Sequence, residues 1–272
     1  MSLRSIILSI LTVSTISCTV KEERSLCPCQ LTVDLSDASE VHGPARVSIW
    51  GLSEMFCSEE IPITGRADSF TKKVTKCEIE ISAVQGLERN KIIGRNVIIN
   101  EGDDSDRVMA YCDVIDCFQE QAKAKATFLK NWSTLTIKYE NPGGGEYPYE
   151  FVISGEINGF DAFSMTPVRG KFRHKAVKTV PDKDEFKTNL PRQFNEDCAL
   201  KLTIMNKRSG EVEKEYDLNE IITESRYDWT CKNLNDLEIY INYAGLLAGV
   251  EIKEWENGSD FSVWNYINPN RI

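Results

Sequence analysis

The chain has 272 residues, 41% of them hydrophobic, and its 32 Lys+Arg against 42 Asp+Glu give a formal net charge of −10. This composition is typical of folded proteins, and the length is sufficient for one large or two ordinary domains. Because non-specific affinity for nucleic acids comes mostly from lysine and arginine, the acidic balance argues against a nucleic-acid partner. Nine cysteines against two histidines make the cysteines the more informative residues.

The amino terminus has the pattern of a secretory signal peptide. Arg4 precedes a mostly apolar run over 5–17, which is shorter than the roughly 20 residues that a membrane-spanning helix needs. Residues 15–18, Thr-Ile-Ser-Cys, resemble the lipobox of bacterial lipoproteins, in which the cysteine is lipidated and becomes the first residue, although leucine is usual in place of the threonine. We therefore expect a lipoprotein signal peptide over 1–17 and a lipid on Cys18. The alternative is a soluble exported protein in which Cys18 merely lies near the cleavage site.

A short lipidated linker is expected over 18–26. Its Lys21, Glu22 and Glu23 resemble the surface-export signal of Bacteroidetes lipoproteins, a lysine followed by acidic residues close behind the lipid. An ordinary charged linker is the alternative. The export signal predicts a protein that is lipid-anchored in the outer membrane and faces outward.

Eight cysteines remain in the body of the chain: Cys27, Cys29, Cys57, Cys77, Cys112, Cys117, Cys198 and Cys231. An even number in an exported chain permits disulfides, but the sequence cannot choose among the many connectivities. Several of these cysteines stand where a strand would turn them inward, so buried free thiols are the alternative. For the Cys-Pro-Cys segment over 27–29 we expect pairing elsewhere or simple packing, because redox pairs have two intervening residues and zinc knuckles need further ligands.

Period-two alternation of apolar and polar residues dominates the chain and predicts strands with one face on a core. It recurs at 31–35, 77–83, 135–139, 200–204, 237–243 and 250–252, with Gly, Pro, Asn and Asp between the runs. We therefore expect an all-β protein built of antiparallel sandwiches. Asp217 followed by Glu220 predicts one short helix, from Leu218 to Ser225.

The segment from Val114 to Lys125 is rich in Gln, Ala and Lys, and we interpret it as a helix or loop that connects two strand-rich regions. This interpretation places a domain boundary near residue 125. We expect an amino-terminal β-sandwich domain over 27–125 and a carboxyl-terminal one over 126–272, each of a size that suits the fold.

No catalytic motif is found, and we expect a protein that is not an enzyme and holds no cofactor or metal. The Walker, nucleophile-elbow and zinc-helix patterns are absent. His42 and His174 are isolated, and His174, between two basic residues, is expected to be exposed. The carboxylates of 101–106 lack the EF-hand register and are interpreted as a solvated turn. Most of the scattered tryptophans are expected to be core anchors with satisfied indole N–H groups.

A series of short motifs after residue 126 has a specific order and spacing. The motifs are Tyr147-Pro148-Tyr149, Ser154-Gly155 with Gly159-Phe160, the segment 167–173, Leu190-Pro191-Arg192, Gly210-Glu211, and Tyr227-Asp228-Trp229-Thr230 before Leu234, Asp236 and 239–243. Together they resemble the carboxyl-terminal domain of the fimbrial anchor family of Bacteroidales, the FimB-like minor fimbrillins. The Cys-Pro-Cys segment and the strand after it resemble the start of that family, whereas 36–125 resembles it mainly in pattern.

These motifs are interpreted as architecture rather than as ligand contacts. Tyr227 and Trp229 follow the short helix, where large aromatic residues plug the end of a sandwich, and Asp228 is expected to cap a turn. Gly155 and Gly159 flank a bend that needs a positive φ or a close approach of two backbones.

The resemblance implies an outer-membrane lipoprotein with two tandem transthyretin-like β-sandwich domains that anchors a fimbria and limits its length. Its partner would be the fimbrial shaft subunit, a fimbrillin, held without a covalent bond by strand exchange. The tail after Trp255 carries Phe261, Val263, Trp264 and Tyr266, and it is either an additional sandwich strand or a segment offered to the partner. A surface adhesin or glycan-binding lipoprotein on the same sandwiches is the alternative function.

Overall fold

Strands make up most of the described chain, as the alternation predicts. The structure is a computed structural model, and it describes residues 27–51, 54–143, 146–178, 184–242, 247–253 and 262–265. The elements are β1 (Cys29–Asp34), η2 (Glu40–His42), β2 (Ala45–Gly51), β3 (Glu54–Ile61), β4 (Ser69–Val74), β5 (Glu78–Gln85), β6 (Lys91–Ile93), β7 (Asn96–Ile98), β8 (Met109–Asp116), β9 (Gln121–Lys125), β10 (Leu129–Lys130), β11 (Trp132–Tyr139), β12 (Tyr149–Asp161), β13 (Pro167–Lys175), β14 (Glu185–Pro191), β15 (Lys201–Asn206), β16 (Val212–Asp217), α2 (Leu218–Glu224), β17 (Asp236–Ile241), β18 (Leu247–Lys253) and β19 (Ser262–Asn265). The expected all-β sandwich fold is confirmed.

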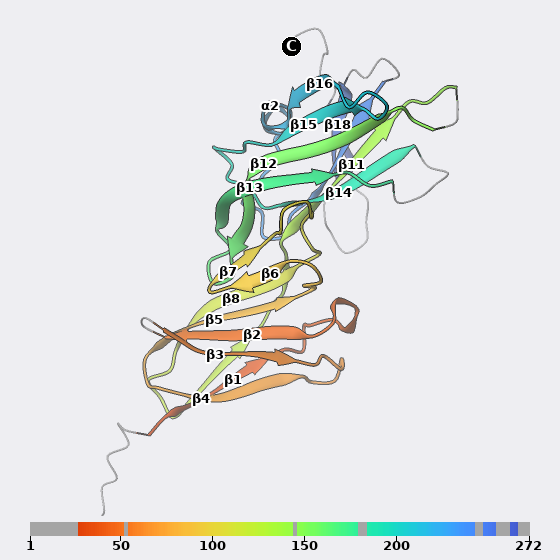
Figure 1. Cartoon of the computed structure of the whole chain (residues 1–272). Coiled ribbons are helices and arrows are strands. Elements are labelled where there is room, and N and C mark those ends of the chain that lie inside the picture. The colour runs from red at the N-terminus through yellow and green to blue at the C-terminus, as the bar shows by residue number, and fades with distance from the viewer. Residues whose placement is uncertain are drawn as a thin grey trace, which may run out of the picture.

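The first sandwich packs the sheet β4-β1-β9 against the sheet β10-β8-β5-β2-β3 (Figure 1). Alternation turns Leu31 and Val33 of β1 toward Ile49 of β2 and Ile81 of β5, and all four side chains are fully buried. β4 runs antiparallel to β1, whereas β9 runs parallel to it.

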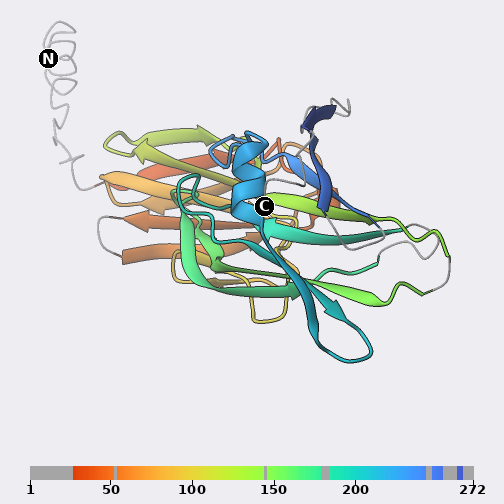
Figure 2. The same cartoon turned by 90° about the horizontal axis from the view of Figure 1, so that it is seen from above.

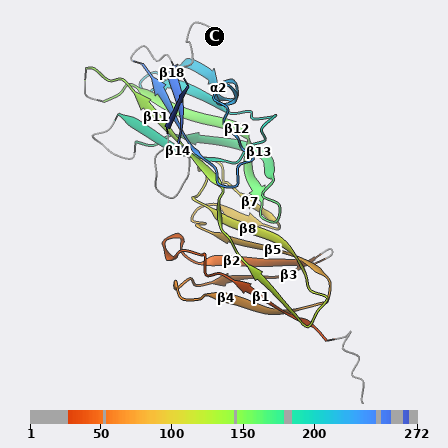
Figure 3. The same cartoon turned by 180° about the vertical axis from the view of Figure 1, so that it is seen from behind.

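The second sandwich consists of the sheet β14-β11-β17-β18-β19 and the sheet β16-β15-β12-β7-β6, with β13 paired to β12 in addition. β12 and β13 face the viewer in Figure 1, and β11, β14 and β18 do so in the view from behind in Figure 3. Its core includes Ile137 of β11, Phe151 of β12 and Ile239 of β17. β11 runs parallel to β17, so each sandwich contains one parallel strand pair in an otherwise mainly antiparallel fold.

Strand pairing and packing join the two sandwiches. β6 and β7 precede residue 125, yet β7 pairs with the end of β12 in the second sandwich. A separate apolar cluster fills the space between the sandwiches and includes Val84, Val97, Val108 and Phe160. The division into 27–125 and 126–272 stays a prediction, and the β7–β12 pairing crosses it.

Gly159 lies where β7 meets β12. A Cβ atom on this residue would come within 2.0 Å of the carbonyl oxygen of Val97, so no side chain fits. The register of β12 against β13 shifts between Gly155 and Ile157 and again between Ile157 and Gly159, as expected for a bent strand. The predicted close approach of backbones is confirmed at Gly159.

The predicted short helix is α2. The carboxylate of Asp217 accepts a hydrogen bond from the backbone N–H of Asn219 at 2.9 Å, which is the cap that the sequence predicted. Leu218, Ile221 and Ile222 pack into the second core. Figure 2 looks down on α2 at this end of the molecule.

The Tyr-Asp-Trp motif closes the same sandwich, as expected. Tyr227 and Trp229 are buried with ring centroids 4.6 Å apart, and Asp228 accepts hydrogen bonds from the N–H and hydroxyl of Thr230 at 2.8 and 2.7 Å. The expectation of a satisfied indole is wrong for Trp229, because its Nε1 is buried without a hydrogen-bond partner among the described residues.

The segment 114–125 is neither a helix nor a loop throughout, so that expectation is wrong. Val114 belongs to β8, and residues 121–125 form β9 beside β1. Ala122 and Ala124 are buried while Gln121 and Lys123 are exposed. The segment therefore alternates with period two, but the small alanines between long polar residues hide its apolar face.

Each of the eight cysteines from Cys27 onward is a free thiol in this structure. Cys29, Cys77, Cys117 and Cys198 are buried, whereas Cys27 is exposed. Buried thiols therefore describe Cys29, Cys77, Cys117 and Cys198 in this structure, while the pairing of cysteines in the exported protein stays a prediction.

Candidate functional site

The carboxyl-terminal edge of the second sandwich is the candidate contact surface for a partner chain. β18 pairs with β17 on one side and with β19 on the other, so β19 is the edge strand. Of the predicted tail residues, Val263 and Trp264 lie in β19, opposite Ile252 and Glu251, while Phe261 and Tyr266 fall outside the described residues. β19 occupies the position of an additional sandwich strand. Its contact with a partner stays a proposal.

A network of charged side chains lies on the same sheet next to β19. Glu238 of β17 accepts a hydrogen bond from Lys138 at 2.6 Å and pairs with Lys253 at 2.8 Å. The hydroxyl of Tyr240 lies 3.1 Å from Glu238 and 3.0 Å from Glu251 of β18. Both carboxylates are buried. The network therefore ties together β11, β17 and β18, the strands that carry the edge.

Burial and the lysines act on the pKa of Glu238 in opposite directions. Burial raises it, but the hydrogen bonds from Lys138 and Lys253 outweigh burial and leave the pKa below its ordinary value. The hydrogen bond to Glu238 also raises the pKa of Lys253. Burial, followed by the hydrogen bond to Glu251, raises the pKa of Tyr240, so the hydroxyl keeps its proton. The network therefore joins neighbouring strands through charge-assisted hydrogen bonds.

The predicted amino-terminal sites fall outside the described residues. They are Cys18 of the lipobox and Lys21, Glu22 and Glu23 of the export signal, and their functions stay predictions. Across the described ranges, no helix combines the length and apolarity that crossing a membrane requires. β1, the first strand after this segment, lies in the part of the first sandwich that is remote from the second (Figure 1).

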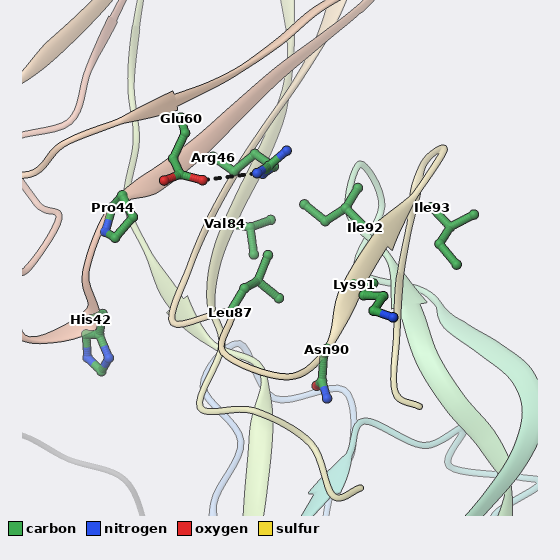
Figure 4. A pocket seen from close by; sticks show the side chains of 10 residues that line it. All are labelled: His42, Pro44, Arg46, Glu60, Val84, Leu87, Asn90, Lys91, Ile92 and Ile93. Carbon is green, nitrogen blue, oxygen red and sulfur yellow. Dashed lines mark hydrogen bonds and ion pairs between the residues drawn. The ribbon is translucent and has the colours of Figure 1, made fainter. Parts of the chain in front are cut away.

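A surface cavity of about 390 Å³ opens beside β2, β3 and β6 (Figure 4). Arg46 of β2 and Glu60 of β3 are opposite each other in the sheet and form an ion pair at 3.0 Å in its wall, which also includes Val84 and Leu87. His42 also lines it, with a pKa lowered by burial and by Arg107 nearby. The lining contains no hydroxyl or thiol nucleophile, and its carboxylate is occupied by an arginine.

His174 is buried, so the expectation that it is exposed is wrong. On β13 the neighbours Arg173 and Lys175 point outward, and the same alternation turns His174 inward, where its Nδ1 lies 2.9 Å from the carbonyl oxygen of Gly102. His174 and the cavity residue His42 thus have separate environments. No cluster of three or more His, Cys, Asp or Glu suited to a metal ion occurs in the described part of the chain.

The acidic segment 101–106 is not a solvated turn, because its last residues fasten the two sandwiches together. Asp106 is 2% exposed, and its Oδ2 accepts the backbone N–H groups of 88–90 at 2.7 to 2.8 Å. Asp104 accepts a hydrogen bond from the guanidinium of Arg89 at 2.5 Å and another from the N–H of Asn189 in β14 at 2.9 Å. Sequence reasoning saw the charges but not these partners, which are distant along the chain.

Arg95 lies at the contact between the two sandwiches, which we call the joint, and its sequence context did not single it out. It lies in the turn between β6 and β7, and its guanidinium bonds Glu80 of β5 at 2.5 and 3.2 Å and Asp161 of β12 at 3.2 Å. It also lies over the rings of Trp50 and Phe163, at 5.4 and 4.5 Å from their centroids. The available signal was a single arginine within the mostly apolar run 92–99.

No protein-family model matches the sequence, and no curated protein matches it in a sequence comparison. Solved structures match in fold. The fimbrial anchor protein Mfa2 from Porphyromonas gingivalis has a TM-score of 0.61 and 11% identity, and the match covers 88% of this chain and 100% of that chain. A candidate polysaccharide-binding protein from Bacteroides thetaiotaomicron has a TM-score of 0.61 and 9% identity, with coverages of 90% and 100%. A candidate adhesin from Bacteroides ovatus has a TM-score of 0.57 and 10% identity, with coverages of 89% and 96%.

At such identities the likeness concerns the fold, and it extends over nearly the full length of each neighbour. The chain therefore shares its fold with a fimbrial anchor protein and with candidate adhesins of Bacteroidales, in agreement with the resemblance of its sequence to a fimbrial anchor-like family.

Proposed function

We propose that this protein is an outer-membrane lipoprotein that anchors a fimbria to the cell surface and limits its length. The observation that carries the proposal is the fold shared with the anchor protein Mfa2, which matches over its whole length. The lipobox at Cys18 and the acidic export signal after it support attachment to the outer membrane. The shared fold and the amino-terminal signals involve different parts of the chain, so the two lines of support are independent.

The distribution of elements along the molecule suits an anchor. β1 follows the proposed lipidated linker and lies at one end of the molecule, whereas the sheet that carries β18 lies at the other (Figures 1 and 3). A pull from the fimbria would then pass through both sandwiches to the lipid. The hydrogen bonds of Arg95 to Glu80 and Asp161, and of Asp104 to Asn189, are placed to resist bending between them.

The proposed contact with the adjacent fimbrial subunit is non-covalent strand exchange. An edge strand presents a row of backbone donors and acceptors that another chain can extend, and side chains in alternate positions provide specificity. β19 is such an edge, and the predicted tail residues Phe261, Val263, Trp264 and Tyr266 surround or belong to it. The protein acts in this proposal as a structural subunit and not as an enzyme.

The anchoring function is tested by removing the lipid acceptor. Cells that carry Cys18→Ala are compared with cells that carry Cys27→Ala, a control at an exposed cysteine outside the lipobox. We expect palmitate labelling to disappear only in Cys18→Ala, and fimbriae of altered length to be shed into the medium. Fimbriae that remain attached and equally long in unlabelled Cys18→Ala cells would overturn the proposal.

A surface adhesin or glycan-binding lipoprotein is the second candidate, because a candidate polysaccharide-binding protein shares the fold equally well. Glycan sites often stack sugars on open aromatic rings. Among the tryptophans whose side chains are described, Trp132 and Trp229 are buried and Trp50 lies beneath Arg95. The anchor is therefore favoured, and specific retention of the purified protein on a glycan array, together with neighbouring genes for polysaccharide uptake, would favour the adhesin instead.

A further inference from the structure

Three thiols gather in the core of the first sandwich. Cys29 begins β1, Cys77 immediately precedes β5, and Cys117 immediately follows β8. Cys29 and Cys117 are fully buried, Cys77 is 7% exposed, and all three belong to one apolar cluster. The proposed anchoring function uses none of them.

Cys77 and Cys117 are neighbours in the same sheet. The register that pairs Glu78 with Asp116 places them directly opposite each other, and the N–H of Cys117 donates to the carbonyl oxygen of Cys77 at 3.0 Å. Cβ atoms of such a hydrogen-bonded pair lie about 5.5 Å apart, whereas a disulfide needs about 3.5–4.5 Å. This pair is therefore poorly placed for a bond between its sulfur atoms.

Cys29 approaches Cys117 from the opposite sheet. It lies on β1 with Leu31 and Val33, whose side chains face the core at the same period, and β1 belongs to the three-stranded sheet. The backbone N–H of Gln30, next to Cys29, donates to the carbonyl oxygen of Glu120 at 2.8 Å, three residues beyond Cys117, so the start of β1 lies beside the connection that carries Cys117. Both thiols are fully buried in the same apolar cluster, and they come from the two layers of the sandwich.

We propose that Cys29 and Cys117 form a disulfide in the exported protein, which joins the two sheets of the first sandwich and leaves Cys77 as a thiol. The oxidant is a disulfide, such as that of an envelope thiol oxidoreductase or of oxidised glutathione in vitro. One thiolate attacks the oxidant and releases one thiol, and the second cysteine attacks the mixed disulfide and releases the other. Both protons pass to the released thiols, the two cysteines are oxidised, and the oxidant is reduced to two thiols.

The bond forms while the first sandwich is still open. Burial raises the pKa of the Cys117 thiol in the folded protein, and the thiolate is the attacking species. Both sulfur atoms are also closed off from reagents in the finished core. Oxidation therefore belongs to folding after export, when the thiols are solvated and have ordinary acidity.

The position of the bond matters for the proposed tether. Cys29 is the first strand residue after the linker from Cys18. A force applied at the lipid would therefore act on the disulfide before it acts on the hydrogen bonds of β1. This consequence rests on the proposed function. The disulfide itself does not, because it is tested on the purified chain.

The test maps the bond by mass spectrometry. The full chain is isolated from the cell envelope with N-ethylmaleimide present and digested without reductant, and a second sample is refolded from denaturant with oxidised and reduced glutathione. We expect a linked peptide pair that contains Cys29 and Cys117, with Cys77 alkylated. Alkylation of both Cys29 and Cys117, or a link from either to another cysteine, in both samples would overturn the proposal.

Variants sharpen the result. Cys77→Ser is the matched control, since it removes a thiol of the same cluster, and we expect it to keep the linked peptide and the rise in thermal midpoint between the reduced and oxidised forms. Cys117→Ser is expected to lose both. Because the peptide map of the unaltered chain decides the question by itself, a variant that fails to fold does not rescue the proposal.

Discussion

The guanidinium of Arg95 grips the carboxylate of Glu80 through both terminal nitrogens, at 2.5 and 3.2 Å, and so links the turn before β7 to the outer face of β5. The same guanidinium reaches Asp161 at 3.2 Å. One side chain thereby connects strands of the first and second sandwiches. The two sandwiches are therefore held together by specific side-chain hydrogen bonds in addition to the chain that connects them.

Replacing this arginine should loosen the joint. We expect Arg95→Ala to lower the free energy of unfolding by about 1–2 kcal/mol, because charge-assisted hydrogen bonds and stacking on two rings are lost while solvent screens part of the effect. Urea unfolding measures the change, with Arg66→Ala, at an exposed arginine of the first sandwich, as the control. Equal stability of the two variants would show that Arg95 does not hold the joint.

The strands were predictable where large apolar residues alternate with polar ones, as at Leu31 and Val33. β9 was not, because alanine presents too little apolar surface to stand out against lysine and glutamine. The joint was not predictable either, since Asp104 and Arg95 find partners on strands that are distant in sequence, Asn189 of β14 and Asp161 of β12. Charge alone cannot distinguish a solvated acidic turn from one whose carboxylate is filled by backbone N–H groups.

Gly159 should tolerate no side chain. In Gly159→Ala the added Cβ would lie 2.0 Å from the carbonyl oxygen of Val97. This oxygen belongs to the backbone of a paired strand, so it cannot move aside as the end of a flexible side chain could. We expect a loss of about 1–3 kcal/mol of unfolding free energy, measured by chemical denaturation. Gly143→Ala is the matched control, because no atom lies within 4 Å of its Cβ position. A Gly159→Ala protein as stable as Gly143→Ala would contradict the close approach of β7 and β12.

Arg192 belongs to the Leu-Pro-Arg motif and clamps a loop. It is buried, and it donates to Asn131 Oδ1 at 2.7 Å and to the carbonyl oxygens of Trp229, Cys231 and Lys232 at 2.6, 2.9 and 3.1 Å. A lysine keeps the charge but cannot reach this fan of acceptors. Arg192→Lys should therefore cost about 3 kcal/mol in thermal or urea unfolding, through the acceptors left unpaired. Arg208→Lys, at an exposed arginine, serves as control. If both variants lose a similarly small amount of unfolding free energy, Arg192 does not hold the loop through these hydrogen bonds.

Glu238 should make stability depend on pH in the acid range. Its pKa in the folded protein lies below the ordinary value of 4.5, so its contribution is fully present above that value and is lost as the pH falls through the folded pKa. Glu238→Gln should remove this part of the decline in the free energy of unfolding at acid pH. Urea unfolding at a series of pH values between neutral and acid measures that free energy. The matched variant Glu101→Gln, at an exposed glutamate, should keep the full decline. Parallel curves for Glu238→Gln and the unaltered chain would contradict the assignment.

The carboxyl-terminal segment should contribute to partner capture. β19 is the edge strand of its sheet, and a chain that ends at residue 258 lacks it and exposes the edge of β18 instead. We expect deletion of residues 259–272 to weaken capture of the adjacent fimbrial subunit in a pull-down, while circular dichroism still reports folded sandwiches. Val212→Ser, on the different edge strand β16, is the control and should leave capture unchanged. If the truncated chain captures the subunit as well as the full chain does, the contact lies on another surface, and the tail serves only to complete the sheet.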